Sequence, residues 1–445
     1  MTGPRPIPAL TKPRPAKVPT VVDTVLDNGL RVLAVRRPGV PLAELRLRIP
    51  FAGPAGKAGD GHIARAQLLG DTLLSGTDRR TASQLAVDLQ TLGGQLSAST
   101  DADRLNLGGS VLTSGLPGLL ELLAEVLTGA AYPKSEVEGE RDRLVQELAI
   151  HRSQAGVVAR EALLGRMYGD HPYGRDLPSA DSVEAVRPRH LRSLHAGRVV
   201  PAGSILTVVG DLTPARTTGL VQQALSTWTA TSPAVPTPAV PAQLGRRAML
   251  LDRPGAVQTT MRFGGDAPSR TAPDYAAFTL ANLIFGGYFS SRWVANIRED
   301  KGYTYSPHSG VDHPPAGSRF VAGADVATGV TAPALLETLY ELGRMATVAV
   351  SQHELDQARR YAIGSMALGT SSQAGLASTL SQLAGAGLGV QWLRDQPTAL
   401  AGVTVADVLA AGDRWLAPAR LTPVLVGDAD KVTGPLQALV ELETP

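Results

Sequence analysis

Histidine is the side chain best suited to bind a catalytic metal or to transfer protons at neutral pH, and the chain has eight histidines. No two of them lie four residues apart, so the histidine pair that binds zinc from one face of a helix is missing. His353 and Glu354 begin a His-Glu-x-x-His pattern, but Gln357 replaces the second histidine. This favours a solvated helix N-terminus over a metal site. His171 opens a His-Pro-Tyr-Gly string that is typical of a turn. The histidines are His62, His151, His171, His190, His195, His308, His313 and His353.

Other reactive groups are equally scarce. The chain has no cysteine, which excludes disulfides, thiolate zinc sites, iron–sulfur clusters and cysteine nucleophiles. It has no Gly-x-Ser-x-Gly nucleophile elbow, and the glycine-rich residues 385–389 lack the Lys-Ser/Thr of a phosphate-binding loop. The sequence therefore contains no complete motif for metal binding, nucleophilic attack or phosphate binding.

Charge and hydropathy exclude two further classes of protein. The 445 residues carry 42 basic and 40 acidic side chains, scattered along the chain, for a net charge of +2, which argues against a nucleic-acid-binding surface. No stretch reaches the 18 or so uninterrupted apolar residues of a membrane helix, and prolines stand where a signal peptide has its apolar core. We expect a cytoplasmic protein that binds neither nucleic acid nor membrane.

Two short strings recur at nearly the same spacing. Arg37-Pro38-Gly39 recurs as Arg253-Pro254-Gly255, 216 positions later. The Val-Gly-Asp that ends residues 205–211 recurs at the end of residues 424–428, at an offset of 217. Two strings that keep one register over about 170 residues predict an internal duplication.

The order of elements within each half predicts the fold class. Apolar strands open and close each half, and helical periodicity fills the middle. Thr81 and Gln84 have the spacing of a capping box before the first of these helices. The pattern predicts an α+β fold of two homologous sandwich-like domains, in which helices pack on one face of a mostly antiparallel sheet. The helices are predicted at residues 82–92, 116–128, 135–153 and 351–366.

A stretch with four prolines separates the two halves and is typical of a semi-rigid linker. We therefore predict a linker at residues 229–243 between an N-terminal domain at 18–228 and a C-terminal domain at 244–445. Residues 1–17, which are basic and rich in proline, are expected to form a flexible arm.

Five strings together carry a family resemblance: TVLDNGLRVLAVRRP (24–38), GHIARAQLLGDTLLSGT (61–77), RMYGDHPYGRD (166–176), VVGD (208–211) and IREDKGYTYS (297–306). In this order they resemble the pitrilysin/insulinase family of zinc peptidases. Within that family, the mitochondrial processing peptidase and the small bacterial processing proteases are most similar. The resemblance extends from about Val21 to Val440.

The resemblance locates the family's inverted zinc motif, His-x-x-Glu-His. Its positions fall on Gln67, Gly70 and Asp71, just before a Leu-x-x-Gly-Thr string that ends at Thr77. Both imidazoles and the general-base carboxylate are thus missing, and only the distal carboxylate is kept, as Glu147. Such a donor set does not suit catalytic zinc. We expect no zinc in this chain and a surface role for Glu147.

The resemblance also gives roles to Arg298 and Tyr305. In family members an Arg and a Tyr at this spacing lie in the C-terminal half and close over the zinc site of another half. The guanidinium can bind substrate carbonyl oxygens in a forked geometry, and the phenol can donate to the oxyanion of the transition state. Arg298 is expected near a helix end, and Tyr305 on a strand that follows Lys301-Gly302.

Two alternatives to these roles remain open in the sequence. Arg298 could merely pair with Glu299 or Asp300, with Tyr305 as a half-buried strand aromatic. Tyr303 is a competing phenol, because residues two apart in a strand face the same side of the sheet.

Some bacterial members of the family resemble a split enzyme, in which one subunit has the zinc motif and the other supplies the Arg and Tyr. We expect this chain to be the second subunit, inactive alone and without a cofactor, in a heterodimer with a homologous zinc-bearing peptidase. The substrate would be an extended peptide, such as a leader or precursor peptide. One alternative is an inactive peptide-binding or structural scaffold subunit, which needs neither Arg298 nor Tyr305. Another is a self-sufficient peptidase that uses Asp71, Glu147 and a histidine.

Overall fold

The computed structural model describes residues 19–229, 232–242 and 245–444. The predicted arm at residues 1–17 lies outside the described residues, as do parts of the predicted linker. The linker residues that are described, 232–242, contain no helix or strand. The domain boundaries stay a prediction.

The first half of the chain builds a six-stranded sheet in the order β1-β2-β6-β3-β5-β4. β2 and β6 are parallel, and the other neighbouring strands are antiparallel. The strands are β1 (Val21–Val25), β2 (Arg31–Arg36), β3 (Leu42–Pro50), β4 (Gln95–Thr100), β5 (Arg104–Leu112) and β6 (Ile205–Gly210).

The second half repeats this sheet in the order β12-β7-β11-β8-β10-β9. β7 and β11 are parallel and lie 217 positions after β2 and β6, so the structure confirms the internal duplication. The outer strands differ, because β12 is parallel to β7 whereas β1 is antiparallel to β2. The strands are β7 (Ala248–Asp252), β8 (Gln258–Ala267), β9 (His308–Asp312), β10 (Ser318–Ala327), β11 (Thr422–Gly427) and β12 (Leu442–Glu443).

The helices of both halves confirm the predicted α+β class. The capping box forms as predicted, with the Thr81 amide donating to Gln84 Oε1 at 2.9 Å and the Gln84 amide donating to Thr81 Oγ1 at 3.3 Å. In the described part of the chain, no helix combines the length and hydropathy needed to cross a membrane. The first half contains α1 (Lys57–Thr72), α2 (Ala82–Thr91), α3 (Leu116–Gly129), α4 (Lys134–Arg152), α5 (Ala155–Tyr168), α6 (Ala180–Glu184), α7 (Pro188–Arg198) and α8 (Pro214–Ala224). The second half contains α9 (Tyr275–Asn282), α10 (Arg292–Val294), α11 (Thr331–Thr347), α12 (Gln352–Gly369), α13 (Gln373–Gly385), α14 (Gln391–Gly402), α15 (Val405–Trp415) and α16 (Ala429–Gln437).

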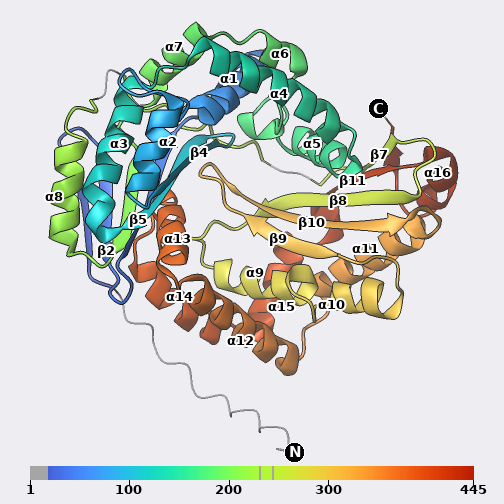
Figure 1. Ribbon diagram of the computed structural model, residues 1–445. Helices are drawn as coiled ribbons and strands as arrows, with labels where there is room; N and C mark the ends of the chain where they lie inside the picture. Colours follow the sequence, from blue (N-terminus) through green and yellow to red (C-terminus); the bar gives the residue numbers. More distant parts are fainter. Residues whose placement is uncertain (1–18, 230–231, 243–244, 445) are drawn as a thin grey trace, which may run out of the picture.

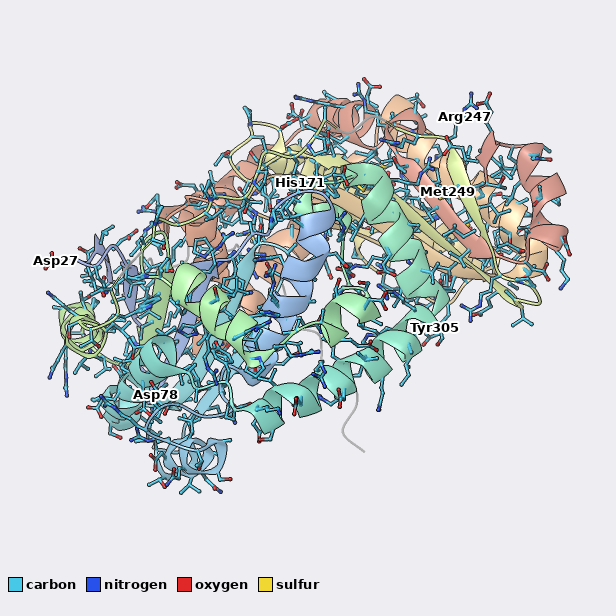
Figure 2. All side chains as sticks on the ribbon, turned by 90° about the horizontal axis from the view of Figure 1, so that it is seen from above. Asp27, Asp78, His171, Arg247, Met249 and Tyr305 are labelled. Atoms are coloured by element: carbon cyan, nitrogen blue, oxygen red, sulfur yellow. The ribbon has the colours of Figure 1, made fainter. Side chains whose placement is uncertain are left out.

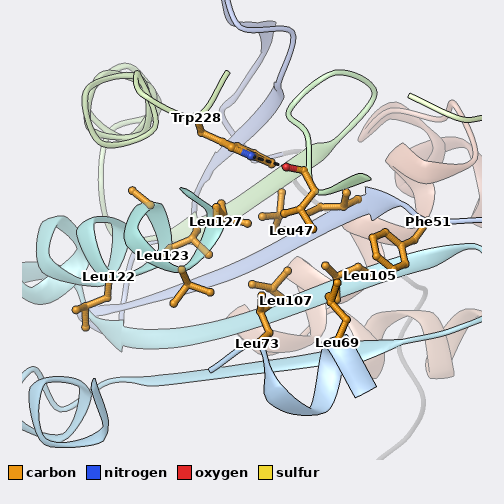
Figure 3. Close-up of a cluster of buried hydrophobic side chains, with 14 of the residues drawn as sticks. Leu47, Phe51, Leu69, Leu73, Leu105, Leu107, Leu122, Leu123, Leu127 and Trp228 are labelled. Atoms are coloured by element: carbon orange, nitrogen blue, oxygen red, sulfur yellow. Dashed lines mark hydrogen bonds between the residues drawn. The ribbon is translucent and has the colours of Figure 1, made fainter. Parts of the chain in front are cut away.

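The apolar core of the first half lies between its sheet and its own helices. Leu69 of α1 and Leu73, which directly follows α1, belong to one buried cluster with Leu47 of β3 and Leu105 of β5 (Figure 3). Trp228 belongs to the same buried cluster, and its indole N–H donates to the carbonyl of Val199 at 2.9 Å. The buried leucines of α1 pack against the sheet and thereby set the rotation of the helix. This rotation determines which of its other side chains face solvent.

The opposite face of each sheet is covered by a helix from the other half. The helix α13 packs on β3 and β6 of the first sheet, and α5 packs on β8 and β11 of the second (Figure 1). Leu376 and Leu380 of α13 are buried with Leu33 and Val209. The prediction of helices on one face only is therefore incomplete, because β2 and β6 of the first sheet and β7 and β11 of the second carry apolar side chains on the other face as well. On the second sheet, the buried residues of this contact are Ala159, Leu163, Leu164, Met167, Tyr168, Val424 and Val426.

Because α13 covers one face of the first sheet, a substitution that leaves a cavity between α13 and this sheet should destabilise the first half. Leu380 is 1% exposed, and its replacement in Leu380→Ala should lower the free energy of unfolding by about 2–5 kcal/mol. Urea unfolding followed by circular dichroism measures this loss, and hydrogen exchange of β2 and β6 shows where it acts. Leu368→Ala in α12, at a residue 75% exposed, is the control and should change the free energy by less than about 0.5 kcal/mol. Unchanged exchange in β2 and β6 would contradict the prediction.

Candidate functional site

The helix α1 carries the positions of the family's zinc motif. Its Leu68 and Leu69 are buried, whereas Gln67 is half-buried and Asp71 is exposed to solvent. The sheet lies directly beside this helix, since α1 contacts the edge strand β4.

The position of the general-base carboxylate is filled by a close contact between helix and sheet. Gly70 is buried against Thr100 of β4, and a Cβ atom at residue 70 would lie 3.1 Å from Thr100 Cγ2. This approach is tighter than ordinary van der Waals contact, so a side chain here requires Thr100 to move. Neither the residue type nor the available space suits a general base.

Asp71 and Glu147 are brought together across α1 and α4. Although Asp71 reaches solvent, the surrounding protein removes part of its hydration and raises its pKa to about 6. The charges of Glu140 and Glu147 also raise this pKa, and Arg143 lowers it. Glu147 itself lies 3.5 Å from Arg143, one helical turn away. This ion pair is the surface role that the sequence suggested for Glu147.

This donor set does not fit a zinc ion. Gln67 and Gly70 offer no anionic or imidazole ligand, so Asp71 and Glu147 are the only carboxylates left at the four predicted positions. Within residues 19–229, 232–242 and 245–444, no three His, Cys, Asp or Glu side chains are placed to hold a metal.

Arg298 lies in the second half, on the wide helical turn η4 (Ala295–Asp300). Its guanidinium carbon is 4.7 Å from the ring centre of Phe289 and 4.8 Å from that of Tyr305. Both rings are exposed, Phe289 at 60% and Tyr305 at 79%. Arg298 also pairs with the exposed Glu299 at 3.1 Å, as the alternative interpretation expected. An exposed ion pair of this kind contributes little to stability. The Arg298 guanidinium can therefore leave Glu299 for another partner.

The prediction that Tyr305 lies on a strand is wrong. Gly302 has φ of +65°, a left-handed conformation that turns the chain after η4, and β9 begins only at His308. As a result, Tyr303 and Tyr305 do not share a face. Tyr303 is half-buried against the core of the second half, whereas Tyr305 extends from the surface beneath Arg298.

The zinc-motif helix and the Arg–Tyr pair lie on different parts of the molecule. Figure 2 shows Tyr305 well separated from Asp78, which follows shortly after α1. His171 has a structural contact, because its ring nitrogen Nε2 lies 3.0 Å from the carbonyl oxygen of Pro238.

Phe289 is a residue of this cluster that sequence reasoning missed. It lies nine positions before Arg298, just after η3 (Leu283–Gly287), and the fold returns it to the same surface. Its only signal in the sequence is an aromatic side chain after a Gly-Gly pair, which is too common to assign a role.

Two family models match the chain. Residues 65–181 match "Insulinase (Peptidase family M16)", and residues 186–361 match "Peptidase M16 inactive domain". The second phrase describes the matched domain. With the duplicated sheets and the motif helix in place, the chain belongs to the M16 family of peptidases.

Similar proteins in several bacteria and a plant agree with this family. An "uncharacterized zinc protease" of Mycobacterium leprae is 28% identical over 296 residues, which span 66% of each chain. One from Streptomyces coelicolor is 25% identical over 299 residues, 65% of this chain and 64% of that protein. A probable mitochondrial-processing peptidase subunit beta of Arabidopsis thaliana is 28% identical over 171 residues, 38% of this chain and 32% of that protein. The matched region spans just under two thirds of the length of the first two relatives.

Solved structures share the fold over nearly the whole chain. A peptidase M16 inactive domain from Pseudomonas fluorescens superposes with a TM-score of 0.84 at 23% identity, covering 92% of this chain and 98% of that one. A protease from Helicobacter pylori gives a TM-score of 0.83 at 19% identity, covering 92% and 99%. These similarities support the two-domain α+β fold.

The donor set predicts that the purified chain contains no stoichiometric zinc. Gln67, Gly70 and Asp71 stand where the ligands and the general base belong, so affinity should not exceed that of an ordinary protein surface. Elemental analysis after dialysis against trace zinc tests this. One zinc per chain, lost in Asp71→Ala or Glu147→Ala, would refute it.

The raised pKa of Asp71 predicts a pH-dependent effect of Asp71→Asn. Because the folded state binds this proton more tightly than the unfolded state, the stabilisation is complete below about pH 4 and lost as the pH rises through about 6. Asp71→Asn should therefore raise the thermal midpoint at about pH 7.5 and change it little at about pH 4. Asp170→Asn, at a side chain 85% exposed, removes the same charge and is the control. If Asp71→Asn stabilised the protein equally at both pH values, the raised pKa of Asp71 would be contradicted.

Proposed function

We propose that this chain is the non-zinc subunit of a heterodimeric metallopeptidase. A homologous M16 partner binds zinc, and this chain supplies Arg298 and Tyr305 from its C-terminal half. The observation that carries the proposal is the contrast between the two halves. The motif helix has lost its ligands and has Thr100 against Gly70, whereas the Arg–Tyr pair is exposed and assembled.

Arg298 is suited to hold the backbone of a substrate. A planar guanidinium donates in a fixed fork, and the faces of Phe289 and Tyr305 orient it without consuming its N–H donors. In the complex, Arg298 binds carbonyl oxygens next to the scissile bond.

Tyr305 is suited to stabilise developing charge. Its phenol is exposed, and the nearby guanidinium favours negative charge beside it. In the transition state the hydroxyl donates to the oxyanion of the scissile carbonyl, an interaction worth roughly 10²–10³ in rate for one such donor. The half-buried Tyr303 has less access to a substrate.

The substrate we propose is an extended peptide. The strand β4 is the edge of the first sheet, and an edge strand can pair with the backbone of a peptide through its free N–H and C=O groups. Unfolded leader or precursor segments fit this mode of binding, because the peptide must present an extended backbone.

Reconstitution with a zinc-bearing homologue tests the proposal. The mixture should cleave peptides that neither subunit cleaves alone, and Tyr305→Phe should slow this cleavage by roughly 10²-fold. Arg298→Ala should raise KM as well as lower kcat, because a carbonyl contact is lost with the charge. The measurements are steady-state cleavage by the mixture and size-exclusion chromatography of the complex.

Tyr303→Phe is the matched control, since it removes the same hydroxyl two residues away, and it should have a much smaller effect. Wild-type turnover in both Arg298→Ala and Tyr305→Phe would make the chain a scaffold subunit. A loss confined to Tyr303→Phe would move the catalytic phenol to Tyr303. Peptide cleavage by this chain alone, at the rate of the mixture, would refute the split enzyme.

A further inference from the structure

A cavity of about 600 Å³ lies between the two halves of the chain. It is bordered by β3, β4 and β5 of the first sheet, by the end of β9 and by α13. The side chains of β4 that line it, Ser97 and Ser99, point away from the face that packs on α1. The cavity is therefore separate from the zinc-motif helix, although both adjoin the same edge strand.

Arginine is the dominant charged residue of this cavity. Arg46 pairs with Glu44 at 3.0 Å, and Arg104 pairs with Asp101 at 2.9 Å. By contrast, Arg48 of β3 and Arg270 after β8 have no carboxylate within 4 Å in the described part of the chain. The remaining acidic side chain of the lining, Asp312, is paired with Arg319.

The two arginines without a carboxylate are partly desolvated and only partly hydrogen bonded. The Nε atoms of both Arg48 and Arg270 are buried without a hydrogen-bond partner. Burial, together with the positive charges of Arg104 and Arg270, lowers the pKa of Arg48 to about 10. A buried cation without a counterion is unfavourable. The positive charges of Arg48 and Arg270 therefore favour the binding of an anion in this cavity.

The Arg48 side chain has a hydrogen bond to a neutral partner, whereas the Arg270 side chain faces an aromatic ring. Arg48 donates to the carbonyl of Ser381 in α13 at 3.1 Å. Arg270 lies 5.8 Å from the ring centre of Trp392, and the indole N–H of Trp392 donates to the carbonyl of Arg270 at 3.4 Å. Two guanidinium groups presented from opposite halves, without an anion of their own, form a preorganised carboxylate site.

We infer that this cavity binds an acidic side chain of an extended peptide, with its carboxylate between Arg48 and Arg270. The inference rests on the proposed peptide-binding function and names the substrate class. A peptide that pairs with the edge of β4 alternates its side chains between the two faces of the sheet. Every second side chain then points to the face of Ser97 and Ser99, where the arginines lie.

Binding of two isosteric peptides to the isolated full chain tests the inference, because the cavity is formed within one chain. The probes are labelled peptides of alternating Val and Thr, which favour extended structure, with one central Glu or one central Gln. Fluorescence anisotropy should show the Glu peptide binding about tenfold more tightly, and added salt should reduce the preference. Arg270→Gln and Arg48→Gln should each abolish the preference.

Arg36→Gln is the matched control, since Arg36 is half exposed, lies outside the cavity and loses the same charge; the preference should persist. Equal affinity of wild type for both peptides would overturn the inference and leave the split peptidase intact. Displacement by inorganic phosphate, without discrimination between the peptides, would make this a free-anion site and would also overturn it. If neither peptide bound while the reconstituted heterodimer was active, the acidic-side-chain site would also be overturned. An inactive heterodimer would instead refute the proposed function, whatever the peptides did.

Discussion

The second face of each β-sheet is apolar on β2 and β6 of the first sheet and on β7 and β11 of the second, and a helix from the other half of the chain covers it there. The second face of the first sheet is covered by α13, and that of the second sheet by α5. Since exposed apolar sheet faces are unfavourable, neither half is complete without the other. The relative position of the halves is thereby fixed by burial of side chains such as Leu380 and Leu163.

This constraint determines where the polar surfaces meet. Docking of α13 on β3 and β6 leaves the outer strands β4 and β5 uncovered on that face, and the cavity forms there. Arg48 and Arg270 approach each other only because the halves are held together in this way. The same packing keeps Tyr305 apart from α1 (Figure 2).

The prediction that the first half holds no zinc rests on packing as well as on residue type. Gly70 lets α1 approach Thr100 closely, and a Cβ atom at residue 70 would lie 3.1 Å from Thr100 Cγ2. Asp71 remains near Glu147, but Arg143 partly neutralises the group and solvent reaches it. The chain keeps the fold of the peptidase family, although Gln67 and Gly70 are not zinc ligands.

The sequence by itself determined the duplication, the α+β class and the long helices, because these depend on local periodicity, capping and repeated strings such as Arg37-Pro38-Gly39. Through the family resemblance it also predicted that Gln67, Gly70 and Asp71 stand at the zinc-motif positions. Only the tertiary structure decided that α5 and α13 cover the opposite sheets, since helix periodicity does not say which sheet a helix meets. It also separated Tyr305 from Tyr303 and placed Phe289 against Arg298. These contacts depend on a turn at Gly302 and on residues distant in sequence, where no local pattern specifies a partner.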